Sequence, residues 1–148
     1  MRIAFDLDGT LADLYGVKNW LEMLINGDAT PYEIAKTLVN MNILARYLNK
    51  LQKKGYEIGI ISWLAKNSDA EYDEKVTKAK ENWLKTHLKS VKFDFINIVS
   101  YGTDKNIVCK SEKDILFDDE INNRKNWNGK AFDVDNILGV LKGLAAAA

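Results

Sequence analysis

The sequence predicts an α/β fold in which one parallel sheet is covered by helices on both faces. Two observations support this prediction. Short apolar segments typical of strands alternate along the chain with longer segments of helical periodicity. Carboxylate and hydroxyl side chains directly follow several of the apolar segments, which is where ligands bind in parallel sheets. The 148 residues are enough for a single domain, residues 1–148, with a substantial core.

The composition is ordinary for a globular protein, with 47% hydrophobic and 28% charged residues. Its 21 basic and 21 acidic side chains balance, so a nucleic-acid partner is possible but not supported by charge. No apolar stretch approaches membrane-spanning length, and Asp6 and Asp8 interrupt the start that a signal peptide would need. Cys109 is the single cysteine, which excludes an internal disulfide. We expect a cytoplasmic protein without a membrane segment.

The first third of the chain is expected to supply one strand and two helical segments. Residues 2–5 form an apolar strand, and residues 11–25 fit a loop followed by a helix that ends near Gly27. A second helix begins with Thr30 as N-cap, Pro31 in the first turn and Glu33 closing a capping box. Apolar residues keep a helical period from there to residue 54, with room for a kink near residues 40–42, and Gly55 ends the helix.

The rest of the chain is expected to alternate strands and helices. The predicted strands cover residues 56–62, 95–99, 114–117 and 131–134. A helix capped by Ser68 or Asp69 follows the first of these, and its apolar stripe includes Val76 and Trp83. The charged side chains of this helix, Lys80 among them, are expected on a solvated face. A closing helix covers about residues 136–144, and residues 145–148 are expected to form a disordered tail.

Two carboxylates lie two positions apart where the first strand ends. Alternation along a strand would point Asp6 and Asp8 to the same side, where like charges repel unless a proton or a cation lies between them. A hard divalent cation held by oxygen ligands, such as Mg²⁺, relieves that repulsion. Gly9 allows a turn, and Thr10 offers a hydroxyl and a backbone N–H to an anion. Carboxylates, cation and anion-binding turn together indicate phosphoryl chemistry.

Polar residues also follow two other predicted strands. Ser62 ends the second strand, and Asp118 and Asp119 end the fourth. Because the carboxyl ends of parallel strands meet at one edge of the sheet, we expect these side chains to gather with Asp6 and Asp8.

These motifs, in this order, resemble those of the haloacid dehalogenase-like phosphohydrolases. Residues 6–10 match the DxDGT motif in full, residues 58–62 match an apolar strand ending in Ser or Thr, and residues 115–119 match a strand ending in an acidic pair. A lysine ahead of that last strand completes the set. The resemblance extends from Ile3 to about Leu141 and implies a three-layer Rossmann-like parallel sheet with a cap inserted after the first strand.

The resemblance also implies roles for the site residues. Asp6 would be the nucleophile that forms an aspartyl-phosphate, and Asp8 the general acid and base. Mg²⁺ would be bound by Asp6, by the backbone carbonyl of Asp8 and by the acidic pair Asp118 and Asp119. The remaining residues, expected to bind the phosphate group, are Gly9, Thr10, Ser62, Trp63 and Lys105.

Two assignments have competing candidates. Lys105 fits the lysine position better because it begins the connection from the third strand's carboxyl end, whereas Lys110 lies closer to the fourth strand. Lys105 would balance the anionic cluster as a compact point charge. In the acidic pair, alignment of the strand ends favours Asp119 on the metal with Asp118 in support.

The insert after the first strand bears on the substrate. About residues 14–39 form the expected helical cap insert, while residues 41–55 serve as a crossover helix of the core. So small a cap leaves the site to be covered by a large substrate or by an oligomer partner. Trp63 at the mouth of the site could stack on a base or form a wall of the pocket.

By resemblance to the small 5′(3′)-deoxyribonucleotidases, the leading function is a Mg²⁺-dependent 5′-(deoxy)nucleotidase that acts on a phosphorylated small molecule. The alternatives within the enzymes are a polynucleotide end phosphatase and another small-molecule phosphatase. A catalytically silent binding domain of the same fold is the non-enzyme alternative.

Overall fold

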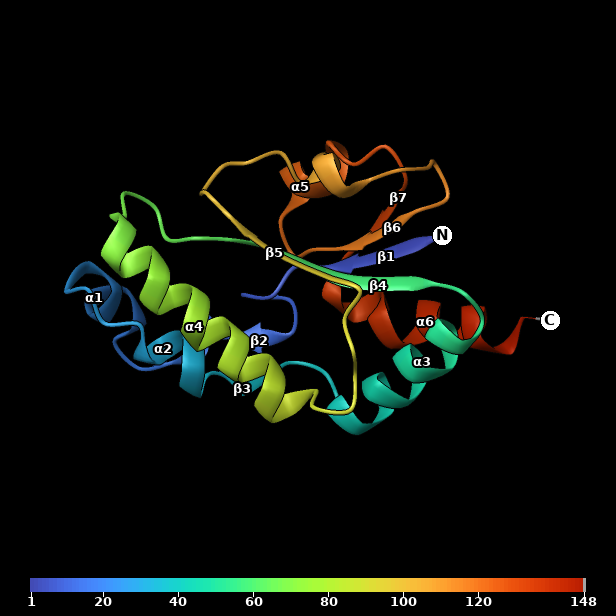
Figure 1. Ribbon diagram of the computed structural model, residues 1–148, viewed down its shortest axis with the longest axis horizontal. Helices are drawn as coiled ribbons and strands as arrows, with labels where there is room; N and C mark the ends of the chain where they lie inside the picture. Colours follow the sequence, from blue (N-terminus) through green and yellow to red (C-terminus); the bar gives the residue numbers. More distant parts are fainter. Residues whose placement is uncertain (148) are drawn as a thin grey trace.

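The computed structural model describes residues 1–147 and contains one five-stranded sheet in which all neighbouring strands are parallel (Figure 1). The strand order is β5-β4-β1-β6-β7. The strands are β1 (Arg2–Phe5), β4 (Glu57–Trp63), β5 (Phe95–Val99), β6 (Ile115–Phe117) and β7 (Lys130–Phe132). These bounds lie within two residues of the five predicted strands, and the predicted α/β class is confirmed.

Side-chain alternation along β1 separates two apolar cores. Ile3 and Phe5 face the larger core, which α3 (Met41–Lys53), α4 (Ala70–His87) and α6 (Ile137–Ala146) cover on one side of the sheet (Figure 1). Ala4 faces a smaller core with Leu116 and Trp127. That second side is covered by two short helices, η2 (Lys105–Val108) and α5 (Ile121–Lys125), and by their loops.

The single helix expected over residues 30–54 is wrong. The segment forms α2 (Thr30–Ile34), a short strand β3 (Lys36–Thr37) and then α3. Asn40 explains the break, because its side chain accepts a hydrogen bond from the backbone N–H of Ile43 at 3.1 Å and so begins a new helix. The predicted capping box is absent too, since the N-cap of α2 is Ala29 and Thr30 donates its N–H to Asp28.

Between β1 and α3 the chain forms a small subdomain beside α4. It contains β2 (Ala12–Asp13), paired antiparallel with β3, η1 (Leu14–Gly16), α1 (Trp20–Ile25) and α2. A third apolar cluster, which includes Leu14, Tyr32 and Val76, packs this subdomain against the first half of α4 (Figure 1). The insert therefore lies next to the carboxyl end of the sheet.

The C-terminal helix is longer than predicted. After η3 (Val134–Asn136), α6 continues to Ala146, and Ala145 is buried in the main core, so these two residues are not the expected disordered tail. The Lys54 ammonium donates to the carbonyl of Ala145 at 2.9 Å, which holds this end of the helix. Residue 148 lies outside the described residues. Within residues 1–147, no helix has both the length and the apolarity needed to cross a membrane.

Candidate active site

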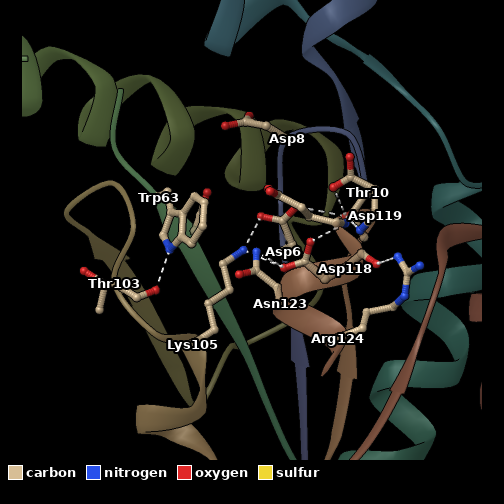
Figure 2. A network of polar contacts seen from close by, with 12 residues as sticks. Asp6, Asp8, Thr10, Trp63, Thr103, Lys105, Asp118, Asp119, Asn123 and Arg124 are labelled. Atoms are coloured by element: carbon tan, nitrogen blue, oxygen red, sulfur yellow. Dashed lines mark hydrogen bonds and ion pairs between the residues drawn. The ribbon is translucent and has the colours of Figure 1, made fainter. Parts of the chain in front are cut away.

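The carboxyl ends of three neighbouring strands bring the predicted site residues together. Phe5 of β1 pairs with Phe117 of β6 on one side and with Ile60 of β4 on the other. The next residue, Asp6, donates its backbone N–H to the carbonyl of Phe117 at 2.9 Å, so it begins its loop beside Asp118. Figure 2 shows the resulting group of polar side chains at this edge of the sheet.

Three carboxylates form the centre of this group. Asp6, Asp118 and Asp119 each offer an oxygen, and these oxygens all lie within 4.8 Å of one another. The ammonium of Lys105 lies 2.8 Å from Oδ1 of Asp6 and 2.7 Å from Oδ2 of Asp118 (Figure 2). Of the two candidate lysines, Lys105 is thus the one that contacts the carboxylates. Lys110 lies in the turn whose backbone N–H groups bind Asp114.

The carboxylate group retains excess negative charge. Burial, and then the charge of Asp6, raises the pKa of Asp118 to about 6 and that of Asp119 to about 7. Burial alone would lower the pKa of Lys105, but the attraction of Asp6 and Asp118 raises it, so the lysine is charged. One ammonium cannot balance three carboxylates, so the site favours a cation or protons.

The acidic pair is divided between two environments. Asp118 is buried, and its carboxylate accepts hydrogen bonds from the Glu120 N–H at 2.9 Å and the Asn123 amide at 3.1 Å, besides the contact with Lys105. Asp119 is exposed and accepts from the Thr10 hydroxyl at 3.2 Å. Asp119 is therefore better placed than Asp118 to give an oxygen to a cation.

In the turn after β1, the groups that were predicted to bind an anion form hydrogen bonds within the protein. The backbone N–H groups of Gly9 and Thr10 donate to the carbonyls of Ala12 and Leu7. The Thr10 hydroxyl lies 2.9 Å from Oδ2 of Asp6 and accepts the Asp119 N–H at 3.1 Å. Both groups of Thr10 are thus used within the protein, because Thr10 is fully buried and its polar atoms need partners there. Thr10 holds Asp6 to Asp119 instead of offering donors to a ligand.

Gly9 is required by this close approach. Its φ of +80° lies in the left-handed region, and a Cβ at this position would lie 2.5 Å from Oδ2 of Asp119. The glycine therefore brings the loop of the nucleophile candidate and the acidic pair together, rather than presenting an N–H to phosphate.

Ser62 and Asp8 meet at a second lysine, which sequence reasoning missed. The Lys80 ammonium donates to Oγ of Ser62 at 2.7 Å and lies 2.9 Å from Oδ2 of Asp8. Lys80 is fully buried, so the expected solvated position is wrong. The burial of Lys80 could have been predicted from its spacing, since it lies four residues after Val76 and three before Trp83 on the buried stripe of α4.

A cavity of about 540 Å³ opens over these residues. Its floor includes Asp6, Asp8 and Lys105, and its walls are rich in aromatic rings. The aromatic lining residues are Tyr15, Trp20, Tyr32, Trp63, Tyr72 and Tyr101. Half of them belong to the segment between β2 and α3, so the small cap insert forms one wall of the cavity.

Trp63 is a fixed wall of this cavity. Its indole N–H donates to the carbonyl of Thr103 at 2.8 Å, and its ring lies 5.0 Å from that of Tyr101 and 5.3 Å from the Lys105 ammonium (Figure 2). The ring thus faces the ligand space beside Lys105. Its contribution to phosphate binding, predicted from the sequence, remains a prediction.

Comparison with known proteins gives a match in structure only. The sequence matches no protein-family model and no curated protein. The fold is similar to the crystal structure of D,D-heptose 1,7-bisphosphate phosphatase from Burkholderia thailandensis, with a TM-score of 0.55 and 10% sequence identity over 99% of both chains. At this identity the likeness concerns the fold. The chain therefore has the fold of a known phosphatase along its whole length, which is the architecture implied by the haloacid dehalogenase-like motifs.

Proposed function

We propose that the protein is a Mg²⁺-dependent phosphatase that hydrolyses a phosphate monoester through an aspartyl-phosphate on Asp6, with 5′-(deoxy)nucleotides as its substrates. The observation that carries this proposal is the placement of Asp6, Asp119 and Lys105 together on the floor of an aromatic cavity. The likeness of the fold to that of a phosphatase supports the same reaction class.

The carboxylates fit a magnesium ion in chemistry and spacing. Asp6, Asp118 and Asp119 each offer a carboxylate oxygen, and these oxygens all lie within 4.8 Å of one another, so they are close enough to share one hard divalent cation, for which carboxylate oxygen is a preferred ligand. Asp6, Asp119 and the backbone carbonyl of Asp8 would hold the ion, with Asp118 in support. Bound Mg²⁺ would reduce the repulsion between the Asp6 carboxylate and the phosphate and stabilise charge on the phosphoryl oxygens.

The residues of the chain supply the two displacements. An oxygen of Asp6, oriented by Lys105 and Thr10, attacks phosphorus while the bond to the leaving oxygen breaks. Asp8 gives its proton to that oxygen, which leaves as the alcohol. Asp8 then takes a proton from a water that attacks the aspartyl-phosphate, releasing inorganic phosphate and restoring both carboxyl groups. Burial raises the pKa of the Asp8 carboxyl, which favours its holding a proton before the first step.

The lining of the cavity supports a substrate with one phosphate group whose leaving alcohol carries an aromatic base. Aromatic side chains from both the cap insert and the core line it, and such rings stack on a base. Its basic lining residues are Lys66 and Lys105, and Lys105 is already bound to two carboxylates. Among residues 1–147, a second phosphate group, such as that of a bisphosphate, would therefore find in this lining only Lys66 as a further basic side chain, together with the acidic Glu120.

The test is a phosphate-release screen with Mg²⁺ and with EDTA. The panel contains 5′-mononucleotides, a 3′-phosphorylated oligonucleotide, sugar monophosphates and bisphosphates, and an aryl phosphate. We expect metal-dependent release, highest from the mononucleotides. Preference for the oligonucleotide or for a sugar phosphate would replace the nucleotide assignment with the corresponding alternative.

The matched variants are Asp6→Asn, expected to be inactive, and Asp135→Asn, an exposed aspartate expected to leave activity unchanged. Retained activity in Asp6→Asn would overturn the nucleophile assignment. Absence of release from every ester by folded protein would instead favour the binding domain.

A further inference from the structure

Lys80 is a buried charge that the two displacements leave without a role. It lies on α4, outside the group formed by Lys105 and its carboxylates, and its side chain is 0% exposed. Its ammonium lies 2.9 Å from Oδ2 of Asp8, donates to Oγ of Ser62 at 2.7 Å and donates to the carbonyl of Trp63 at 2.6 Å. The ring of Tyr32 lies 5.0 Å away, so the ammonium is enclosed by the cap insert as well.

These contacts use the whole donor capacity of the lysine. An ammonium has three N–H bonds, and Lys80 has one acceptor for each of them. Lys80 is also absent from the residues that line the cavity, whereas Lys105 is among them. Lys80 is therefore not a phosphate ligand, and any effect on the reaction passes through the groups that it holds.

The direction of each contact decides what those groups can do. Because the Ser62 oxygen accepts from Lys80, its own hydrogen remains available for another acceptor, although Ser62, like Lys80, is fully buried and is not among the residues that line the cavity. Lys80 contacts Asp8 through Oδ2, which leaves Oδ1 for proton exchange with a ligand in the cavity that Asp8 lines. Figure 2 shows Asp8 next to a helix and apart from Asp6 and Asp118, the two carboxylates that Lys105 contacts. Lys80 is the side chain that fixes it there.

We propose that Lys80 is a positioning residue that holds the Asp8 carboxyl in the orientation needed for proton transfer to the leaving oxygen, with the Ser62 hydroxyl helping to fix the ammonium in place. The inference rests on the proposed phosphatase function. In the step concerned, the bond from phosphorus to the leaving oxygen breaks, the bond from phosphorus to Asp6 forms, and the Asp8 proton moves to the leaving oxygen. Without Lys80, the Asp8 carboxyl loses its anchor, and proton delivery suffers more than the attack by Asp6.

The test compares two esters that differ in their need for that proton. Phenyl phosphate releases a basic phenolate that requires protonation, whereas 2,4-dinitrophenyl phosphate releases a far more acidic phenol that leaves without it. We measure kcat/KM for both esters with Mg²⁺ in the wild type and in Lys80→Met. The expected loss is on the order of 100-fold for phenyl phosphate and under about 10-fold for the dinitrophenyl ester.

Three controls make the result decisive. Lys78→Met changes an exposed lysine on the same helix and should leave both values unchanged. Lys80→Arg keeps the charge and should restore part of the loss for phenyl phosphate. The ratio of the two kcat/KM values is independent of the fraction of enzyme that is folded, so partial unfolding of Lys80→Met does not mimic the effect.

The outcomes separate the two proposals. A selective loss for phenyl phosphate supports the positioning role. An equal loss for both esters, or no loss, overturns it while leaving the phosphatase function in place. If the wild type hydrolyses neither these esters nor any other ester with Mg²⁺, the proposed function fails and the positioning role fails with it.

Discussion

Replacing Lys105 by methionine tests the charge balance of the site without a substrate. The Lys105 ammonium lies 2.8 Å from Asp6 and 2.7 Å from Asp118, and its side chain is 2% exposed. At an effective dielectric constant of about 20, each contact contributes about 6 kcal/mol of attraction before the cost of desolvation. Burial of the charges costs several kcal/mol for each ion, so the net contribution is much smaller.

We expect Lys105→Met to lower the free energy of unfolding by about 3–5 kcal/mol at pH 8, the range found when one member of a buried ion pair is removed. Methionine keeps most of the lysine side-chain volume, so the fall in unfolding free energy comes from the lost charge and not from a cavity. The assay is urea unfolding followed by circular dichroism in EDTA. Lys110→Met, which changes the exposed competing lysine, should stay within about 0.5 kcal/mol of the wild type.

The pH dependence of this loss has a definite sign. The pKa of Asp118 in the folded wild type is about 6, above the ordinary 3.8, and removal of Lys105 raises it further. Between pH 3.8 and about pH 6, Asp118 holds its proton in the folded state but has lost it in the unfolded state, so the free energy of unfolding falls as pH rises. The loss of unfolding free energy caused by Lys105→Met should therefore be smaller at pH 5 than at pH 8, because protonation of Asp118 removes one unpaired charge.

A double-mutant cycle with Asp118→Asn isolates the contact. We expect a coupling energy of about 1–3 kcal/mol between Lys105 and Asp118. A fall in unfolding free energy below about 1 kcal/mol in Lys105→Met would refute the view that this lysine balances the carboxylates. So would additive effects of the two substitutions on that free energy.

Three further predictions concern the same carboxylates. Mg²⁺ should raise the melting temperature more at pH 8 than at pH 5.5, because Asp119 with a pKa of about 7 must lose its proton to bind the ion; an equal rise in Asp119→Asn would contradict this. Asp6→Asn should abolish phosphate release while the melting temperature stays similar or rises, since carboxylate repulsion is relieved; a large fall in melting temperature would argue against that repulsion. Gly9→Ala should cost at least about 1 kcal/mol in urea unfolding and lower activity, because φ is +80° and the new Cβ would meet Asp119; unchanged stability would disprove the strain.

The sheet and the edge of the site could be predicted because their signals are local. Each strand is a short apolar run, and β1 and β5 begin and end where the sequence indicates. The carboxyl ends of parallel strands meet at one edge, and the structure adds that β1 and β6 are neighbours in register, which places Asp6 and Asp118 side by side.

The missed features depend on partners far away in the sequence. Lys80 is surrounded by charged residues along the chain, so local composition indicates solvent, yet its burial depends on acceptors from the ends of β1 and β4. Thr10 matches a motif that suggests anion binding, but its hydroxyl is taken by Asp6 and Asp119 once the loops meet. The helical period of residues 30–54 likewise concealed the pairing of β3 with β2, which draws the chain out of the helix before Asn40 begins α3.

The two buried lysines divide the site by function. Lys105 contacts Asp6 and Asp118, and Lys80 contacts Asp8, so each lysine serves a different carboxylate group. With Asp119 included and all groups ionised, four carboxylates and two ammonium groups leave a net charge of −2, which a single divalent cation would balance. Without that cation the floor of the cavity repels a phosphate dianion. A domain that only bound phosphate esters would be better served by fewer carboxylates, so this arrangement favours an enzyme that recruits Mg²⁺ over a silent binding domain.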